Sequence, residues 1–283
     1  MKRSFLGRLQ RAALLSLIGA LLLLLLVPGL QLLVLGPLGY GIALASSQAS
    51  LLWIQGHTAL FLLYRLALLL GFALLLGLPF ALFRIIVAQE IIGRADIATQ
   101  EEEDEENTNT GEDEEKNQQT QTQTTPGENG MPSFAWRGKG FAVIAAWTGL
   151  PGLLLVAGGT LASTIYLWSS SSVISAQAQL PDNFASVTSL FAILTYTAGG
   201  GLLALSCIFF GLVIARSGRK LWPDSWVAFS YMALITGALS SGSTVQVALA
   251  PTSSQATLTT PTILFFALWS LWFAIMVIRL KAE

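Results

Sequence analysis

Residues Ala12–Leu35 read AALLSLIGALLLLLLVPGLQLLVL, an unbroken apolar run that decides the class of fold. A helix of about 20 residues crosses the roughly 30 Å hydrocarbon core of a bilayer at about 1.5 Å of rise per residue. The run is longer than this and does not alternate, so it predicts a transmembrane helix and not a strand of a β-barrel. The whole chain of 283 residues is 53% hydrophobic and 11% charged, whereas a soluble domain is about 25% charged.

Five further apolar runs follow, and together they predict an all-α, polytopic membrane protein with six transmembrane helices paired as three hairpins. The expected spans are 12–35, 58–87, 141–168, 185–215, 226–248 and 262–278. We divide the chain into an N-terminal transmembrane hairpin (1–94), a cytoplasmic linker (95–138) and a four-helix transmembrane domain (139–283).

The linker carries most of the acidic residues. Residues 101–115 read EEEDEENTNTGEDEE and precede a tract rich in Gln and Thr. Twelve acidic residues and one basic residue between 95 and 136 give this segment a net charge of −11, against +10 for the rest of the chain. Because the segment has no apolar periodicity, it cannot bury enough surface to offset the entropy of ordering. We expect a disordered linker, with 101–115 a candidate docking segment for a basic cytoplasmic partner.

The distribution of Lys and Arg predicts the orientation of the spans. The connections at 36–56, 169–183 and 250–260 contain neither residue, and fourteen of the fifteen basic residues fall on the opposite side. Positively charged loops stay in the cytoplasm, whereas acidic residues count little toward orientation. Both termini are therefore expected to be cytoplasmic, in an integral protein of a bacterial plasma membrane or a related internal membrane.

The first apolar run has a second interpretation, a cleaved signal peptide. Basic residues precede the run, and Ala43–Leu44–Ala45 resembles a cleavage site. The apolar core of a signal peptide is only about 7–15 residues long, however, and Ala45 lies well beyond the run. This favours a retained anchor helix, and the other five spans keep their orientation in either case.

Similar strings occur in the three outer connections. They read SQASL at 47–51, AQAQL at 176–180 and SQATL at 254–258. One interpretation is a hairpin repeated three times, since internal repeats are common in transporters. The other is that Ser, Ala and Gln are ordinary loop residues.

Arg65 is the one basic residue outside the charge pattern, because it lies one to two turns inside the second expected span. A charged residue within a span indicates a functional site by default. The alternative is an anchor, in which the apolar stem follows the helix and the guanidinium reaches the outer head groups. No Asp or Glu lies inside an expected span. The candidate partners of Arg65 are therefore a lipid phosphate or an anionic substrate.

Small and polar residues concentrate in the third, fourth and fifth spans. Small residues let helix backbones approach closely, and the alternative is a water-lined cavity with unwound backbone near the glycines. The candidate packing residues are Gly158, Gly159, Gly199, Gly200, Gly201, Gly237 and Gly242. The stretch 240–246 reads SSGSTVQ, too polar to face lipid on all sides; it adds Ser240, Ser241, Thr244 and Gln246 to Arg65 as candidate contacts for substrate or lipid.

Residue patterns for catalysis or metal binding do not occur in the sequence. His57 is the only histidine and Cys207 the only cysteine, whereas a metal site needs several ligands. Residues 104–115 come nearest to a calcium-binding loop, but Asn109 stands where that loop needs glycine. We expect no enzyme activity, cofactor or metal, and no binding to nucleic acid.

Residues Thr195–Leu221 read TYTAGGGLLALSCIFFGLVIARSGRKL. The Thr-Ala-Gly-Gly element within a span, followed by an Arg-rich inner turn, resembles the four-span chloroplast inner-envelope permease and protein-import family and its cyanobacterial relatives. The resemblance covers under a tenth of the chain, and the first hairpin and the acidic linker do not fit it.

Two classes of function follow from these patterns. The small-residue faces, the lack of titratable groups within the spans and the acidic segment favour a non-catalytic membrane subunit or assembly factor. The glycines, the polar fifth span and Arg65 favour a small permease or channel, with a cavity lined by spans three to five. The expected partners are the lipid bilayer and either another membrane protein or further copies of this chain.

Overall fold

The structure is a computed structural model that describes residues 3–89, 133–177, 180–251 and 258–280. Every regular element in these ranges is helical, and six helical stretches are long and apolar enough to cross a membrane. These are Gly7–Leu35, Thr58–Gln89, Gly140–Ile174, Phe184–Gly218, Asp224–Leu249 and Thr259–Ile278. The prediction of an all-helical protein with six apolar spans is confirmed, whereas the acidic run 101–115 lies outside the described residues.

The first span is one rod built from four helical segments. They are α1 (Arg3–Leu21), the π-helix η1 (Leu22–Leu26), α2 (Val27–Gly29) and the π-helix η2 (Leu30–Leu35). Pro28 lies in α2, between the two π-helices. It has no N–H to donate, and its ring crowds the carbonyl one turn earlier. The wider π turns on either side keep the chain helical through this point, as in the 2.8 Å bond from Gly36 N to Gln31 O, five residues back.

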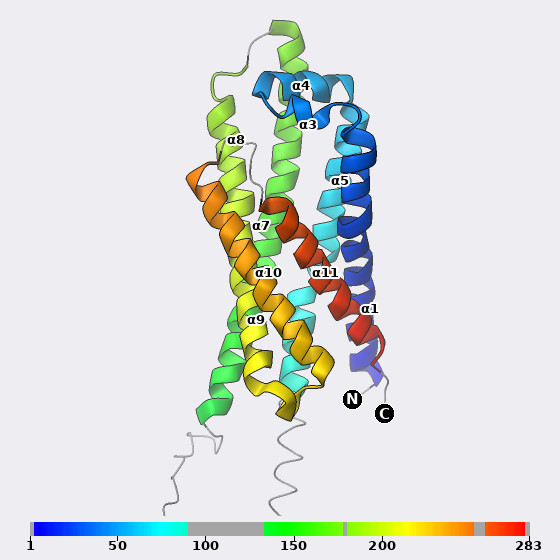
Figure 1. The fold of residues 1–283 in the computed structure, drawn as a ribbon, viewed down its shortest axis with the longest axis vertical. Helices are drawn as coiled ribbons and strands as arrows, with labels where there is room; N and C mark the ends of the chain where they lie inside the picture. The colour runs from blue at the N-terminus through cyan, green and yellow to red at the C-terminus, as the bar shows by residue number, and fades with distance from the viewer. Residues whose placement is uncertain (1–2, 90–132, 178–179, 252–257, 281–283) are drawn as a thin grey trace, which may run out of the picture.

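Two short helices fill the connection 36–56, for which the sequence predicted no regular structure. They are α3 (Tyr40–Ala43) and α4 (Ser47–Gly56), and they lie across one end of the bundle (Figure 1). Ser46 caps α4 by accepting a hydrogen bond from Ala49 N at 3.1 Å. Apolar residues of α4 pack with neighbouring spans in a small cluster of Leu51, Ile54, Phe61, Ile174 and Phe184. This end of the bundle is therefore covered by packed helix.

The second span is broken, although its sequence predicted one continuous helix. α5 (Thr58–Leu74) ends in a turn at 75–77, and a helical segment at 78–89 completes the span. Proline disfavours helical geometry in the residue before it but fits the first turn of a new helix, where its missing N–H is not needed. Pro79 accordingly stands at the second position of the new segment.

The remaining spans are formed by α7 (Ser133–Gln177), α8 (Phe184–Ala192), the π-helix η3 (Ile193–Gly199), α9 (Gly200–Leu221), α10 (Asp224–Leu249) and α11 (Thr259–Ile278). α7 extends beyond the expected span 141–168 at both ends. At its far end the serine hydroxyls donate to carbonyls three residues back, as Ser171 Oγ does to Trp168 O at 2.7 Å. These bonds satisfy the serine side chains within the helix, so the polar run 169–172 does not end it.

The six spans form a closed ring in chain order. The first span contacts α5, α5 contacts α7, α7 contacts α9, α9 contacts α10, α10 contacts α11, and α11 returns to α1. Figure 1 shows α11 beside the first span, with both termini at the same end of the bundle. Every span therefore has one side facing a common interior.

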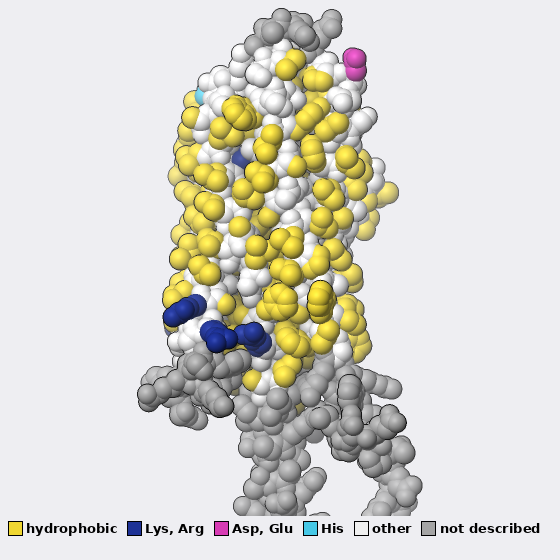
Figure 2. Space-filling model, turned by 180° about the vertical axis from the view of Figure 1, so that it is seen from behind, with side chains coloured by type: hydrophobic (Ala, Val, Ile, Leu, Met, Phe, Trp, Pro, Cys, Tyr) yellow, Lys and Arg dark blue, Asp and Glu magenta, His cyan; other side chains and the backbone are white. Residues whose placement is uncertain are grey.

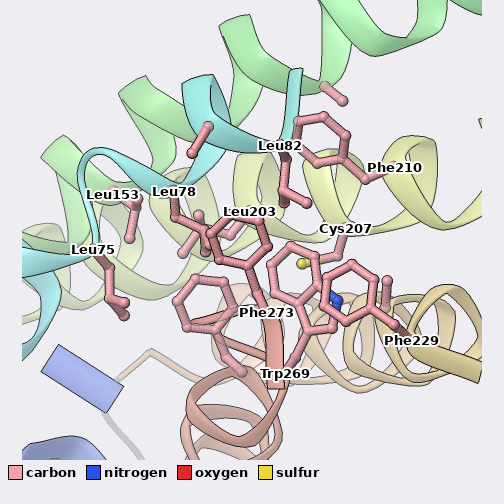
Figure 3. Packing of buried hydrophobic residues seen from close by; sticks show 14 of the residues in the cluster. Leu75, Leu78, Leu82, Leu153, Leu203, Cys207, Phe210, Phe229, Trp269 and Phe273 are labelled. Atoms are coloured by element: carbon pink, nitrogen blue, oxygen red, sulfur yellow. The ribbon is translucent and has the colours of Figure 1, made fainter. Parts of the chain in front are cut away.

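Large side chains fill the half of this interior nearer the termini. Figure 3 shows Leu78, Leu82, Phe210, Phe229, Trp269 and Phe273 packed together there. The rings of Phe229 and Trp269 are stacked, with centroids 5.3 Å apart and planes 13° apart. The cavities lie in the other half of the interior.

The outer surface of the bundle is apolar along its sides (Figure 2). Leu33 is 78% exposed and Ile42 is 82% exposed, which would be unfavourable in water and is suited to lipid. Arg8, Arg11 and Arg279 are exposed near the end that carries the termini, where Figure 2 shows the Lys and Arg side chains gathered.

Candidate functional site

Two adjoining cavities lie in the half of the bundle away from the termini. The Arg65 cavity, of about 160 Å³, is lined by residues of α5, α7, α8 and η3. The central cavity, of about 40 Å³, is lined by residues of α5, α7, η3, α9, α10 and α11. Thr160, Thr195 and Tyr196 line both cavities. A continuous set of side chains therefore connects Arg65 to the centre of the ring.

Arg65 enters its cavity from α5, inside the bundle. Its guanidinium carbon lies 5.4 Å from the centre of the Phe61 ring, an arrangement that stabilises a cation over an aromatic face. The Tyr40 side chain lies close enough to the guanidinium to interact with it. Its Nε, however, is buried and has no hydrogen-bond partner within the described residues. Neither Asp182 nor Asp224, the only acidic residues described, lines a cavity.

Tyr166 brings a second unpaired donor to the same cavity. Its hydroxyl is buried and lacks a hydrogen-bond partner among the residues that the structure covers. The ring is held in place by Phe184, at 5.9 Å and 26°, and by Phe191, at 5.9 Å and 59°. Buried polar atoms are nearly always hydrogen-bonded, so two unpaired donors at one cavity indicate a site for a bound group.

The other hydroxyls of the Arg65 cavity are bonded to their own helices. Thr160 Oγ1 donates to Val156 O at 2.7 Å, Ser163 Oγ donates to Thr160 O at 3.0 Å, and Thr188 Oγ1 donates to Phe184 O at 2.8 Å. Each oxygen keeps lone pairs for a ligand or water, and each hydroxyl can rotate. This wall is polar without carrying charge.

The residues shared by the two cavities lie where the backbones of neighbouring helices pack closely together. A Cβ atom on Gly159 would overlap the Thr195 hydroxyl, so only glycine leaves room for that side chain. A Cβ on Gly199 would lie 2.9 Å from Val156 Cγ2 and 3.2 Å from Gly152 O. Thr195 and Tyr196 themselves stand on the π-helix η3, a wider turn that is frequent at functional sites.

The predicted contact residues of the fifth span do not all reach the cavities. Ser240 is buried and lines the central cavity. Ser241, Thr244 and Gln246 line neither cavity. Ser241 Oγ donates to Gly237 O at 2.9 Å, Thr244 Oγ1 donates to Ser240 O at 2.8 Å, and Gln246 Oε1 accepts from Leu258 N at 3.2 Å. In their place, Ser243 faces the central cavity beside Ser240.

The predicted packing glycines also divide by position. A Cβ on Gly237 would lie 2.6 Å from Ile208 Cγ1, and one on Gly242 would lie 3.2 Å from Leu258 Cδ1. Gly200 and Gly201 face Thr244 at 3.3 and 3.5 Å, which leaves them less crowded than Gly199. Gly158 is exposed and has no atom within 4 Å of such a Cβ. Direct neighbours in sequence therefore differ in how tightly they pack.

Sequence reasoning missed most of the Arg65 cavity. Thr160, Ser163 and Tyr166 recur at intervals of three along an apolar helix and share one face of it. That spacing was a usable signal. Thr188 and Thr195, seven residues apart in the next span, carried the same signal.

Within the described ranges, no three or more His, Cys, Asp or Glu side chains lie together in a group that could hold a metal ion. His57 instead stacks on Trp53, with ring centroids 4.6 Å apart, and its Nδ1 lies 3.2 Å from Trp53 O. Cys207 is buried in the core. The cavities can thus offer hydroxyls, one guanidinium and apolar surface to a ligand.

Comparisons with known proteins give no match to a family model, a curated protein or a solved structure. The resemblance of Thr195–Leu221 to the chloroplast inner-envelope family is therefore not accompanied by a family match. Function has to be argued from the cavities.

Proposed function

We propose that this protein is a small membrane permease and that its substrate occupies the two cavities. The observation that carries the proposal is the adjacency of the Arg65 cavity and the central cavity, whose linings share Thr160, Thr195 and Tyr196. A guanidinium whose Nε lacks a partner within the described residues is costly inside an apolar bundle, and hydroxyls from the third and fourth spans line the same cavity. A subunit that served only to pack against other proteins would need neither feature.

A permease fits this geometry better than an open channel does. Phe229, Trp269 and Phe273 fill the interior on the side of the termini, so a solute in the cavities has no open path to that side. Transporters alternate access by moving helices around a fixed site, commonly where helices are interrupted. The interruptions here are the turn at 75–77 and the π-helix η3.

Leucine at Ser240 is expected to block the central cavity, and leucine at Ser241 is the matched control. Ser240 lines this cavity and Ser241 does not, although the two residues are adjacent on one helix. The assay is stopped-flow swelling of proteoliposomes in glycerol, methylammonium or methanesulfonate. Ser240→Leu should slow the transported solute about tenfold or more, which corresponds to about 1.4 kcal/mol of barrier. Equal rates in both variants and the wild type would remove the central cavity from the path.

The proposal includes three hairpins with both termini in the cytoplasm, so that Arg65 lies in the outer half of the bundle. Its support is the exposed arginines near the end that carries the termini and the retention of positive charge on the cytoplasmic side. In a Cys207→Ala background, Ala45→Cys should react with a membrane-impermeant maleimide on intact cells. Arg279→Cys should react only after the cells are permeabilised. The reverse pattern would invert the orientation.

The role of a non-catalytic subunit or assembly factor stays a prediction. Its distinctive element, the acidic run 101–115, lies outside the described residues. Affinity purification in mild detergent tests it, because a stoichiometric membrane partner lost on deletion of 101–115 would favour this role over a permease.

A further inference from the structure

We infer that the Arg65 cavity binds a small amphipathic anion, with its oxyanion group held by Arg65 and Tyr166 and its apolar part directed toward the central cavity. This inference rests on the proposed function and names the chemical class of the substrate. It follows from three features of the cavities: their charge, their unpaired donors and their apolar wall.

The charge of the site selects an anion. Among the residues that the structure describes, Arg65 is the only charged one that lines either cavity. A guanidinium remains protonated in a protein, and an uncompensated charge away from water is strongly unfavourable. A carboxylate, phosphate or sulfonate supplies the missing counter-charge and accepts the fork of N–H groups that Arg65 presents. A cationic ligand would be repelled.

The unpaired donors fix where the oxyanion group lies. Arg65 Nε and the Tyr166 hydroxyl come from α5 and α7, and both lack a partner among the described residues. Both residues line the Arg65 cavity, and in this proposal one group with two or three oxygens accepts from both donors. Ser163 and Thr188, whose hydroxyls complete the polar wall, can rotate to donate to the remaining oxygen.

The apolar wall fixes the other end of the ligand. Beyond the three shared residues, most of the surface of the central cavity is apolar and includes Leu68, Phe72, Ile263 and Phe266. Hydroxyl residues also line it, namely Ser240, Ser243, Thr259 and Thr262. An inorganic ion would leave the apolar surface uncovered, whereas a short hydrocarbon or aromatic group would cover it. The volumes, about 160 and 40 Å³, suit a compact ligand. A membrane lipid offers the same chemistry if its head group lies at Arg65.

Calorimetric titration of the purified full-length protein in a neutral detergent tests the inference. Hexanesulfonate is the main probe, because it stays ionised at every working pH. Methanesulfonate lacks the hydrocarbon part, and hexyltrimethylammonium reverses the charge. We expect hexanesulfonate to bind about tenfold or more tightly than methanesulfonate, since burial of each CH₂ group contributes, and the cation not to bind. Equal affinity for the cation and the anion would overturn the inference.

Two variants with matched controls assign the residues. Arg65→Met should abolish binding of hexanesulfonate, whereas Arg84→Met, on the same span but exposed, should bind as the wild type does. Tyr166→Phe removes only the hydroxyl and should weaken binding about tenfold. Its control is Tyr231→Phe, at an exposed residue of α10. Tyr166→Phe keeps the test decisive if Arg65→Met does not fold. Wild-type affinity in both cavity variants would contradict the assignment.

Mass spectrometry of bound lipid separates the two sources of the anion. An anionic lipid that copurifies with the wild type, is displaced by hexanesulfonate and is lost in Arg65→Met would identify a lipid head group. Binding of hexanesulfonate without such a lipid would identify a free solute. Absence of both would overturn the inference. If hexanesulfonate binds but no solute crosses the membrane, the permease function is refuted and the anion site stands. If glycerol crosses the membrane but hexanesulfonate does not bind, the anion site is refuted and the permease function stands.

Discussion

Methionine at Arg65 is expected to stabilise the ligand-free protein while it abolishes uptake of hexanesulfonate. Arg65 Nε is buried without a partner in the described part of the chain, and the desolvation of a buried ion costs several kcal/mol, part of which methionine should recover. Each kcal/mol raises Tm by about 2–4 °C in a chain of this size. Loss of a buried charge partner weakens binding by about 2–5 kcal/mol, so uptake at low substrate should fall about 30-fold or more.

The opposite signs of the two effects make this prediction specific. A guanidinium that only anchors the span at the lipid head groups would give lower stability and unchanged uptake when replaced. Thermal unfolding without ligand and uptake into proteoliposomes measure the two quantities on the same preparation. Arg84→Met is the control, because Arg84 is exposed on the same span. A lower Tm in Arg65→Met together with normal uptake would support the anchor.

Leucine at Gly199 is expected to prevent correct packing of α7 against the π-helix η3. The first added carbon alone would lie 2.9 Å from Val156 Cγ2, 3.1 Å from Val156 N and 3.2 Å from Gly152 O. Two of these three atoms are backbone and cannot move without shifting a helix. Overpacking typically costs about 1–3 kcal/mol and occasionally more, and contact with backbone places this variant at the upper end. The measurement is the unfolding temperature, with the yield of monodisperse protein as a second readout.

Gly158 provides the control for this substitution. It lies on α7, also within a span, but a Cβ there meets no atom within 4 Å. Gly158→Leu should therefore unfold at or above the wild-type temperature, because leucine has the higher helix propensity by somewhat under 1 kcal/mol. Similar losses of unfolding temperature in the two variants would show that the close approach of α7 and η3 does not determine stability.

The number and class of the spans could be predicted from the sequence, because the length of an apolar run and the absence of alternation are local properties. The breaks were only partly predictable. Pro28 and Pro79 look alike in sequence, yet the chain passes the first with π turns and ends a helix before the second. The presence of a proline alone therefore does not decide whether the helix continues past it.

The cavities were harder to predict than the spans. Arg65 was found because a charge inside an apolar run is rare. Tyr166 was missed because an aromatic residue near the end of a span is ordinary. Ser240 and Ser241 could not be distinguished, since adjacent residues on a helix point about 100° apart and only the packed structure shows which one faces inward. The sequence pattern therefore supplied candidate residues, whereas the rotation of each helix within the ring determines which of them line a cavity.

Counterflow of hexanesulfonate in proteoliposomes tests the central claim, that a solute anion crosses the membrane through these cavities. Vesicles that contain the wild-type protein are loaded with unlabelled hexanesulfonate, diluted, and given a trace of labelled compound outside. A permease exchanges the two, so labelled hexanesulfonate should accumulate transiently above its equilibrium level, and Arg65→Met vesicles should show no such accumulation. Entry of label at the rate of protein-free vesicles, with or without loading, would contradict the account.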